Sequence, residues 1–128
     1  MDIYRQQILD HYKHPQNFGH LSNADVSITL FNSACGDKII MELKFGNDKK
    51  TIKNIGFLGE GCAVSQASAS LLTEHVRGMV KEKVMKLTVN NIGDLLHTTL
   101  TPSRVKCALL PLEALQKCIL EWEKPKVV

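Results

Sequence analysis

The sequence predicts an α+β fold: a small antiparallel three-stranded sheet with helices packed on one face. Three alternating segments follow one another between residues 25 and 59, and helical spacing dominates the chain after residue 62. Successive strands joined by short links are typical of an antiparallel meander. Strands first and helices afterwards favour an α+β fold with the helices on one side of the sheet. A length of 128 residues fits a single domain over residues 1–128.

The first two predicted strands place apolar side chains at every second position along one face, which is the period of a strand, and the third segment is also predicted as a strand. The segments are DVSITLFN, KIIMELKF and TIKNIGFLG, at residues 25–32, 38–45 and 51–59. A cluster of Gly, Asn and Asp at residues 46–48 separates the second segment from the third and favours a turn. One face of the second segment carries only large apolar residues, so we expect that face in the core.

The helix predictions rest on apolar spacing and on the residues that start and stop helices. The first helix is predicted over residues 2–13, with Asp2 as its cap and Pro15 ending it. The second follows Cys62 and is rich in small residues, which allow a helix to lie close to a sheet. Further helices are predicted over residues 81–86, 90–97 and about 108–123, with a loop over residues 98–104. Pro111 is compatible with the last helix only in its first turn, which places Cys107 just before that turn or within it.

Composition excludes several classes of function. The formal net charge is only +3 and aromatic residues make up 5% of the chain, so neither a basic surface nor base-stacking aromatics predict nucleic-acid binding. No apolar run approaches the roughly 20 residues that span a bilayer, and the N-terminus lacks the apolar segment of a secretion signal. We therefore expect a cytoplasmic protein with no nucleic-acid partner and no membrane contact.

Four cysteines are the main chemical signal. In a reducing cytosol they are thiols, metal ligands or nucleophiles more often than disulfides. Cys35, Cys62 and Cys107 fall at junctions between predicted elements, where loops carry function, and glycines flank the first two. Cys118 falls inside the last helix near its apolar stripe, so we expect it in the core. The alternative to a functional site is that Cys35, Cys62 and Cys107 are also small buried side chains.

The motif ACGD suggests what the three thiols share. In extended chain, Cys35 and Asp37 point to the same side because they are two residues apart. Three thiolates and one carboxylate form a four-ligand set that suits Zn²⁺, or iron bridged by sulfide. A carboxylate binds soft metals less tightly than a fourth thiolate would. Such a set therefore suits a site that releases what it binds.

Three motifs together resemble the IscU/SufU/NifU-N-terminal family of iron–sulfur cluster assembly proteins. They are ACGD, GFLGEGCAVSQASASLLTE and RVKCALLPLEAL, and the opening YRQQILDHYKHPQNFG resembles that family as well. The resemblance covers nearly the whole chain. It implies a small sheet with helices on one side. It also implies a site made of Cys35, Asp37, Cys62 and Cys107.

The chain combines marks of two branches of that family. Lys106 stands before the third cysteine, where the IscU branch has His, and TPSRVKC lacks that branch's full chaperone-recognition motif. Lys106 and GCAVSQASAS resemble the SufU branch, whose members usually bind zinc at this site. The SufU branch also carries an insertion of roughly twenty residues between the second and third cysteines. Here the spacing between Cys62 and Cys107 resembles that of the IscU branch, so both branches stay open.

The resemblance implies a scaffold rather than an enzyme. A cysteine desulfurase would supply sulfur, a labile [2Fe–2S] cluster would form with iron on the four ligands, and apo iron–sulfur proteins would receive it. Cys107 is the expected sulfur acceptor, because a following helix and the cations of Lys106 and Arg104 favour its thiolate. One alternative is a SufU-type sulfur carrier with zinc at the same ligands. Another is a structural metal domain that serves as an interaction module. We expect a monomer or a weak dimer.

Overall fold

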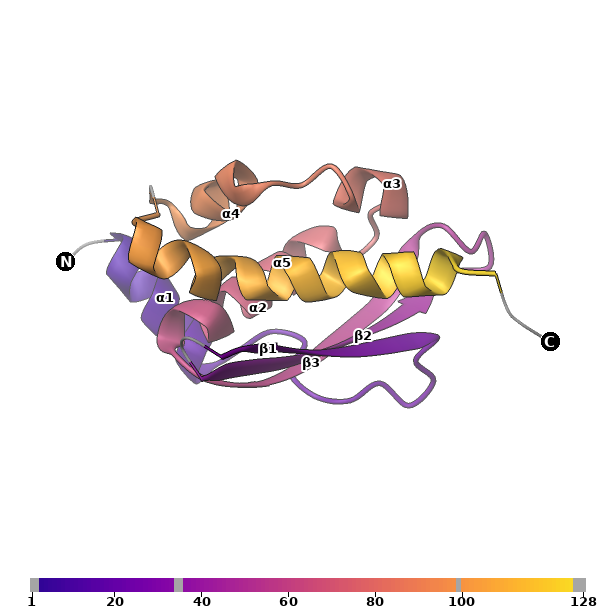
Figure 1. Cartoon of the computed structure of the whole chain (residues 1–128), viewed down its shortest axis with the longest axis horizontal. Coiled ribbons are helices and arrows are strands. Elements are labelled where there is room, and N and C mark those ends of the chain that lie inside the picture. Colours follow the sequence, from indigo (N-terminus) through magenta and orange to yellow (C-terminus); the bar gives the residue numbers. More distant parts are fainter. Residues whose placement is uncertain (1–2, 34–35, 99, 126–128) are drawn as a thin grey trace.

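A computed structural model describes residues 3–33, 36–98 and 100–125. It contains one sheet, with the helices lying on a single face of it (Figure 1). The α+β prediction is therefore confirmed. The elements are α1 (Ile3–Lys13), β1 (Val26–Asn32), β2 (Asp37–Phe45), β3 (Ile52–Glu60), α2 (Ala63–Val76), α3 (Lys81–Val84), α4 (Val89–Leu96) and α5 (Pro102–Glu123). Asp2, the predicted cap of the first helix, lies outside the described residues.

The sheet is the predicted antiparallel meander, in the order β1-β2-β3. Its central rows pair Ile28 with Met41 and Met41 with Phe57, and the last two side chains are fully buried. Alternation places these residues on the face that the helices cover. The apolar pattern read from the second segment thus identified the core face correctly.

Helices α2 and α5 cover that face side by side (Figure 1). The small residues of α2 permit this close approach, because Ala67, Ser68 and Ala69 are all buried. The Ser68 hydroxyl donates a hydrogen bond of 2.6 Å to the carbonyl of Ala108 on α5. This bond fixes the two helices to each other close to their N-terminal ends. The N-terminal ends of the two helices therefore lie at the same end of the sheet.

The last helix is longer than predicted. The loop predicted over residues 98–104 holds for residues 98, 100 and 101, which lie outside the helices. From Pro102 onward it is wrong, and so is the helix start near residue 108, because α5 begins at Pro102. Proline is favoured at the first helical position, where its missing N–H costs nothing. Pro111 then lies inside the helix and not in its first turn. Packing against the sheet and α2 outweighs the lost hydrogen bond of that proline, and Leu110 and Leu112 on either side of it are buried.

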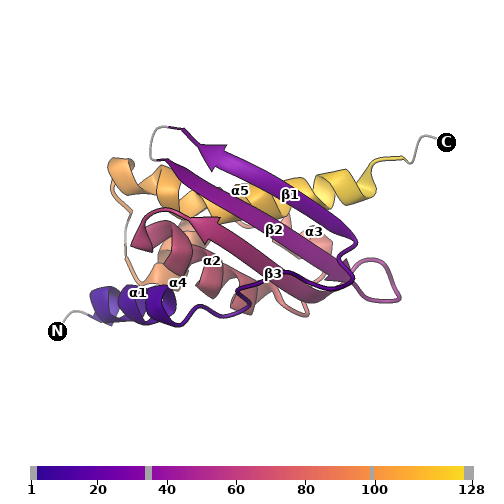
Figure 2. The same ribbon diagram turned by 90° about the horizontal axis from the view of Figure 1, so that it is seen from below.

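The chain between α1 and β1 forms a strap, residues 16–21, along the outer edge of β3 (Figure 2). Its backbone pairs with Phe57: the N–H of Gly19 donates to the Phe57 carbonyl at 2.8 Å, and the N–H of Phe57 donates to the carbonyl of Asn17 at 3.0 Å. The strap passes close over β3 at Gly56, where a Cβ atom would lie 2.6 Å from the Gly19 carbonyl oxygen. Only glycine fits the strand at that point.

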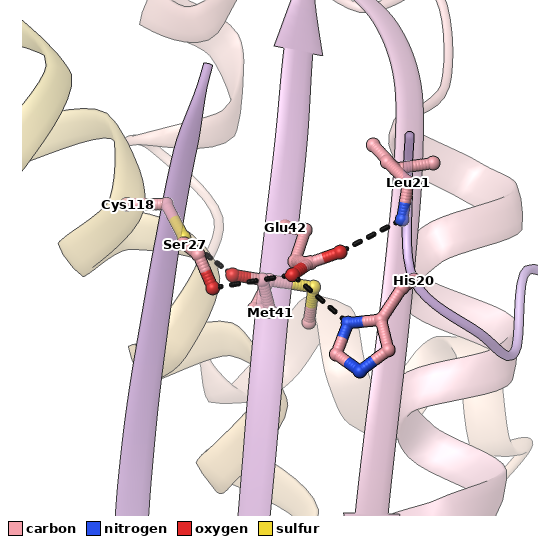
Figure 3. Close-up of polar contacts among 6 residues, drawn as sticks. All are labelled: His20, Leu21, Ser27, Met41, Glu42 and Cys118. Atoms are coloured by element: carbon pink, nitrogen blue, oxygen red, sulfur yellow. Dashed lines mark hydrogen bonds and ion pairs between the residues drawn. The ribbon is translucent and has the colours of Figure 1, made fainter. Parts of the chain in front are cut away.

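A buried carboxylate holds the strap to the central strand (Figure 3). Glu42 is 9% exposed, accepts the N–H of Leu21 at 2.8 Å and lies 3.1 Å from the ring Nδ1 of His20. Burial alone would raise the pKa of Glu42, but the contacts with Leu21 and His20 outweigh it and lower that pKa below its ordinary value.

Among the described residues, no helix is long and apolar enough to cross a membrane.

Candidate metal and sulfur site

Three of the four predicted ligands meet at one end of the sheet. Asp37 is the first residue of β2, Cys62 immediately precedes α2, and Cys107 lies on α5. One ligand atom from each lies within 4.8 Å of the other two, although 25 and 45 residues separate them along the chain. Among the described residues, Asp37, Cys62 and Cys107 form the group of side chains that could hold a metal ion.

Asp37 is the centre of the group and is almost completely buried, with 1% exposure. Its Oδ1 accepts the backbone N–H of Cys62 at 3.0 Å, and its Oδ2 lies 3.7 Å from the Cys62 sulfur. A carboxylate is costly to bury unless it is paired, and these contacts offset the cost of burying Asp37. The bond to the Cys62 backbone also fixes the start of α2 against the start of β2.

Cys62 is the N-cap residue of α2, and it is exposed. The backbone N–H of Ser65 points at its sulfur from 3.5 Å, and the Ser65 hydroxyl donates to the Cys62 carbonyl at 3.1 Å. Cys62 therefore lies at the N-terminal end of a helix, where free backbone N–H groups such as that of Ser65 are available to its sulfur. Ser65 was not predicted as part of the site. A cysteine three residues before a serine at a helix start is the signal that could have identified it.

Two glycines make room for this arrangement. Gly61 has a φ of +145°, and a Cβ atom there would overlap the carboxylate of Asp37. At Gly59, a Cβ atom would lie 2.6 Å from the side-chain amide nitrogen of Gln66. The glycines around Cys62 therefore permit close approach of neighbouring side chains. The group closest to Gly61 is the carboxylate of Asp37, a predicted ligand of the same site.

Cys107 lies deeper than the sequence indicated. It is the sixth residue of α5, in the second turn, so its predicted position before the helix or in the first turn is wrong. The cause is the earlier helix start at Pro102. Cys107 is only 8% exposed, whereas Lys106 and Arg104 are exposed. The cysteine that directly precedes a helix is therefore Cys62, whereas Cys107 lies within α5.

The remaining cysteines differ in what the structure says of them. Cys35, the fourth predicted ligand, lies outside the described residues. Next to it, Gly36 has a φ of +71°, and its N–H donates to the Asn32 carbonyl at 2.8 Å, which closes a turn between β1 and β2. Cys118 is fully buried and its thiol donates to the Met41 carbonyl at 3.2 Å (Figure 3). Burial raises the pKa of Cys118 to about 12. Its predicted core position is confirmed.

The described donor set fits a thiophilic metal. Two thiols and one carboxylate suit Zn²⁺ or an iron–sulfur cluster and do not suit Mg²⁺ or Ca²⁺, which prefer oxygen ligands alone. Ligands about 2.0–2.3 Å from a tetrahedral ion lie roughly 3.3–3.8 Å apart. Atoms already within 4.8 Å of one another need only small side-chain movements to reach that geometry.

The fold and this site define a class: small α+β proteins in which the ends of a sheet strand and two helices hold a thiolate and carboxylate ligand set. A family model for the NifU-like N-terminal domain matches residues 3–127. The chain belongs to the NifU-like N-terminal domain family, as the resemblance of its motifs implied.

Named relatives represent both branches. The chain is 33% identical to the zinc-dependent sulfurtransferase SufU of Bacillus subtilis, in a match covering 94% of this chain and 92% of the relative. It is 32% identical to the iron–sulfur cluster assembly scaffold protein IscU of Streptococcus pyogenes, over 91% of this chain and 82% of that protein.

A solved structure supports the fold itself. The N-terminal part of a nitrogen-fixing NifU-like protein from Brucella abortus matches with a TM-score of 0.78 and 20% identity. That match covers 97% of this chain and 96% of the other. At this identity the likeness concerns the arrangement of the sheet and helices alone.

Proposed function

We propose that this protein is a scaffold for iron–sulfur cluster assembly, which receives sulfur from a cysteine desulfurase and passes a [2Fe–2S] cluster to apo-proteins. The observation that carries the proposal is the meeting of Asp37, Cys62 and Cys107 within 4.8 Å at one end of the sheet. The fourth ligand in this proposal is Cys35, the cysteine of the ACGD motif. Relatives named as scaffolds support the same function.

The exposure of the thiols determines where sulfur arrives. A donor persulfide, R–S–S–H, transfers its outer sulfur when a thiolate attacks that atom; the S–S bond breaks, and R–S⁻ leaves. Cys62 is exposed and receives an N–H at its sulfur, whereas Cys107 is 8% exposed. Sulfur therefore arrives first at Cys62. Cys107, predicted from the sequence as the acceptor, takes part as a ligand or as a later acceptor, with Lys106 and Arg104 as its cationic neighbours.

Asp37 makes the bound cluster exchangeable. Its carboxylate is a harder ligand than a thiolate, so its bond to iron is weaker. It also has an alternative partner, because the N–H of Cys62 holds the carboxylate in place when it is not a ligand. Release of the cluster can begin at this residue without leaving a buried charge unpaired.

Zinc at the same ligands is the second candidate function. It is favoured by the similarity to a zinc-dependent sulfurtransferase at 33% identity and by the suitability of the ligand set for tetrahedral zinc. In that case Asp37, Cys35, Cys62 and Cys107 would hold the ion, which would order the thiols and keep them reduced. Sulfur transfer to Cys62 would use the same exposed edge of the site.

Metal analysis and anaerobic reconstitution test the two candidates together. Protein purified without oxygen is supplied with ferrous iron and inorganic sulfide, and the visible absorbance of a cluster is recorded. Gain of that absorbance supports the scaffold. About one zinc per chain, retained when iron and sulfide are added, supports the zinc-bound carrier and contradicts the scaffold.

The acceptor is tested with single variants. Cys62→Ser is expected to abolish persulfide formation on the protein from a desulfurase and cysteine, as measured by mass spectrometry of the intact chain. Cys107→Ser is expected to retain it while losing cluster stability. Persulfide formation that survives in Cys62→Ser and disappears in Cys107→Ser would assign the acceptor role to Cys107.

A further inference from the structure

A groove lies on the face of the sheet that the helices leave open. Its volume is about 300 Å³, which is enough for one large side chain and part of a backbone. Its lining residues are Phe18, Lys38, Ile40, Leu58, Gly59 and Glu60. Ile40 and Leu58 form its floor and pair with each other across β2 and β3. Because side chains alternate along a strand, this floor faces away from Met41 and Phe57 in the core.

The groove adjoins the site along both of the strands that form it. Lys38 directly follows Asp37, and Glu60 is separated from Cys62 only by Gly61. Leu58 and Cys62 are four positions apart in the chain, so their Cα atoms are at most about 14 Å apart. A segment of a few residues bound in the groove can therefore reach Cys62.

Phe18 forms one wall of the groove, and it is held in an exposed position. Phe18 is 52% exposed, and its ring meets the ring of Phe57 edge-on, with the centroids 5.4 Å apart. The strap keeps it there: residues on both sides of Phe18 hydrogen-bond to the backbone of Phe57, and Glu42 binds the strap at Leu21. Figure 3 shows this carboxylate holding the strap. Several interactions thus fix in place an apolar ring that water surrounds on one side.

The charges at the rim favour an uncharged occupant. Lys38 and Glu60 are register partners on neighbouring strands, so the groove ends in one cation and one anion. The Lys38 ammonium also lies 5.7 Å from the ring centroid of Phe31, which is 68% exposed on the adjoining part of the same face. An apolar floor with balanced rim charges does not select an acidic or a basic peptide.

We propose that this groove binds a large apolar side chain on the persulfide-bearing segment of the sulfur donor, and so delivers the donor's sulfur to Cys62. The inference rests on the proposed function and adds the surface that recognises the partner. It also predicts the donor's chemistry: an extended segment with a Leu, Met or aromatic side chain within about four residues of the reactive cysteine.

The positions of the ligands favour the donor over a cluster acceptor as the occupant. A donor has to reach one exposed thiol, and Cys62 follows Glu60 of the groove by two residues. An acceptor has to replace every ligand, including Cys107, which is buried on α5 beneath the opposite face. A groove whose lining ends at Lys38 and Glu60, close in the chain to Cys62, serves the first of these tasks.

The test compares Phe18→Ala with Leu120→Ala, which removes an apolar side chain of similar exposure, 51%, from α5. A purified cysteine desulfurase with L-cysteine supplies the sulfur, and persulfide on the scaffold is measured as a function of scaffold concentration. Phe18→Ala is expected to raise the apparent KM about tenfold, the size expected from losing one buried apolar contact, with the maximal rate retained. Leu120→Ala is expected to behave like the unchanged protein.

A second variant and a second reaction keep the result interpretable. Ile40→Thr retains a β-branched residue in the strand but makes the floor polar, and it is expected to raise the apparent KM in the same way. Reconstitution with ferrous iron and inorganic sulfide bypasses the donor and is expected to be unchanged in both groove variants. If the unchanged protein itself fails that reconstitution, the proposed function is wrong, independently of the groove.

Three outcomes would overturn the proposal. Equal apparent KM values for Phe18→Ala and Leu120→Ala would show that the groove does not bind the donor. A defect confined to cluster transfer to an apo-protein would assign the groove to the acceptor. A change in self-association by analytical ultracentrifugation, with unchanged sulfur delivery, would assign it to a second copy of this chain.

Discussion

Two aspartates at opposite ends of β2 make similar hydrogen bonds for different purposes. Asp48, in the turn after β2, is exposed and accepts the N–H groups of Lys50 and Thr51 at 3.0 Å and the Thr51 hydroxyl at 2.6 Å. The Thr51 hydroxyl and these backbone donors lower its pKa to about 2. Asp37, at the start of β2, is buried and accepts the N–H of Cys62, which is 25 residues away.

The difference separates a structural carboxylate from one available for chemistry. All described partners of Asp48 lie within three residues of it, so it stabilises a turn and nothing else. The neighbours of Asp37 in the site are the thiols of Cys62 and Cys107, which come from the start of α2 and from α5. Asp37 is thus a buried carboxylate beside two thiols that could bind metal, whereas Asp48 is exposed. A similar contrast in position distinguishes the cysteines.

The largest expected contrast lies between the thiols of Cys62 and Cys118. A thiol with a pKa of about 12 has about a thousandth of the thiolate of an ordinary cysteine, and Cys118 is also completely buried. Iodoacetamide is expected to modify Cys62 at least about a thousand times faster in the folded protein. Peptide mass spectrometry over time measures both rates, and urea should remove the difference. Comparable rates under native conditions would contradict the buried position of Cys118.

Gly61→Ala is expected to have the next largest effect, because a methyl group at that φ of +145° overlaps the Asp37 carboxylate. We expect a loss of about 2–4 kcal/mol of unfolding free energy and at least tenfold weaker metal binding. Gly78→Ala is the matched control, since Gly78 also has a positive φ, +86°, but its Cβ would meet nothing within 4 Å. It should cost about 1 kcal/mol and leave metal binding unchanged. Urea unfolding and zinc competition measure the two effects.

Asp37→Ala tests whether the site transfers its cargo or is only structural. The cluster is expected to last several-fold longer, because loss of the weakest ligand slows ligand exchange. The unpaired N–H of Cys62 should cost about 1–3 kcal/mol of stability. Asp48→Ala, the control, should lower the thermal midpoint without affecting cluster lifetime. Loss of stability with no change in transfer rate would favour a structural metal domain. Decay of the cluster absorbance measures lifetime.

Most of the fold could be predicted because it depends on local patterns. The alternation of β2 identified the core face, and its turn residues marked the hairpin that follows. The start of α5 was missed because Pro102 was interpreted as a loop residue, although proline is also favoured at the first helical position. Pro111 reinforced that error, since tertiary packing decides whether an interior proline is tolerated.

The sequence predicted which residues meet in the site, but not how deeply each of them is buried. The spacing of ACGD and the glycines around Cys62 indicated a shared site, and the structure brings Asp37, Cys62 and Cys107 together. The sequence did not indicate that Cys62 is exposed and Cys107 buried, because that depends on where α5 begins. The histidines are spread along the chain without ligand spacing, so the contact of His20 with Glu42 was not predicted either.

The smallest expected effect concerns Glu42, which holds the strap and hence Phe18. Its pKa is lowered in the folded protein, so its contribution to stability is present above its ordinary value of 4.5 and is lost as the pH falls through the lower folded value. Glu42→Gln is expected to lower the unfolding free energy by about 1 kcal/mol at neutral pH and by less in acid. Urea unfolding at a series of pH values measures this difference. Ser27→Ala is the control, because its hydroxyl contributes only a long bond of 3.4 Å to the same carboxylate. If the two variants lose equal stability at every pH, the strap does not depend on the charge of Glu42, and Phe18 is held by the backbone bonds of Asn17 and Gly19 with Phe57 alone.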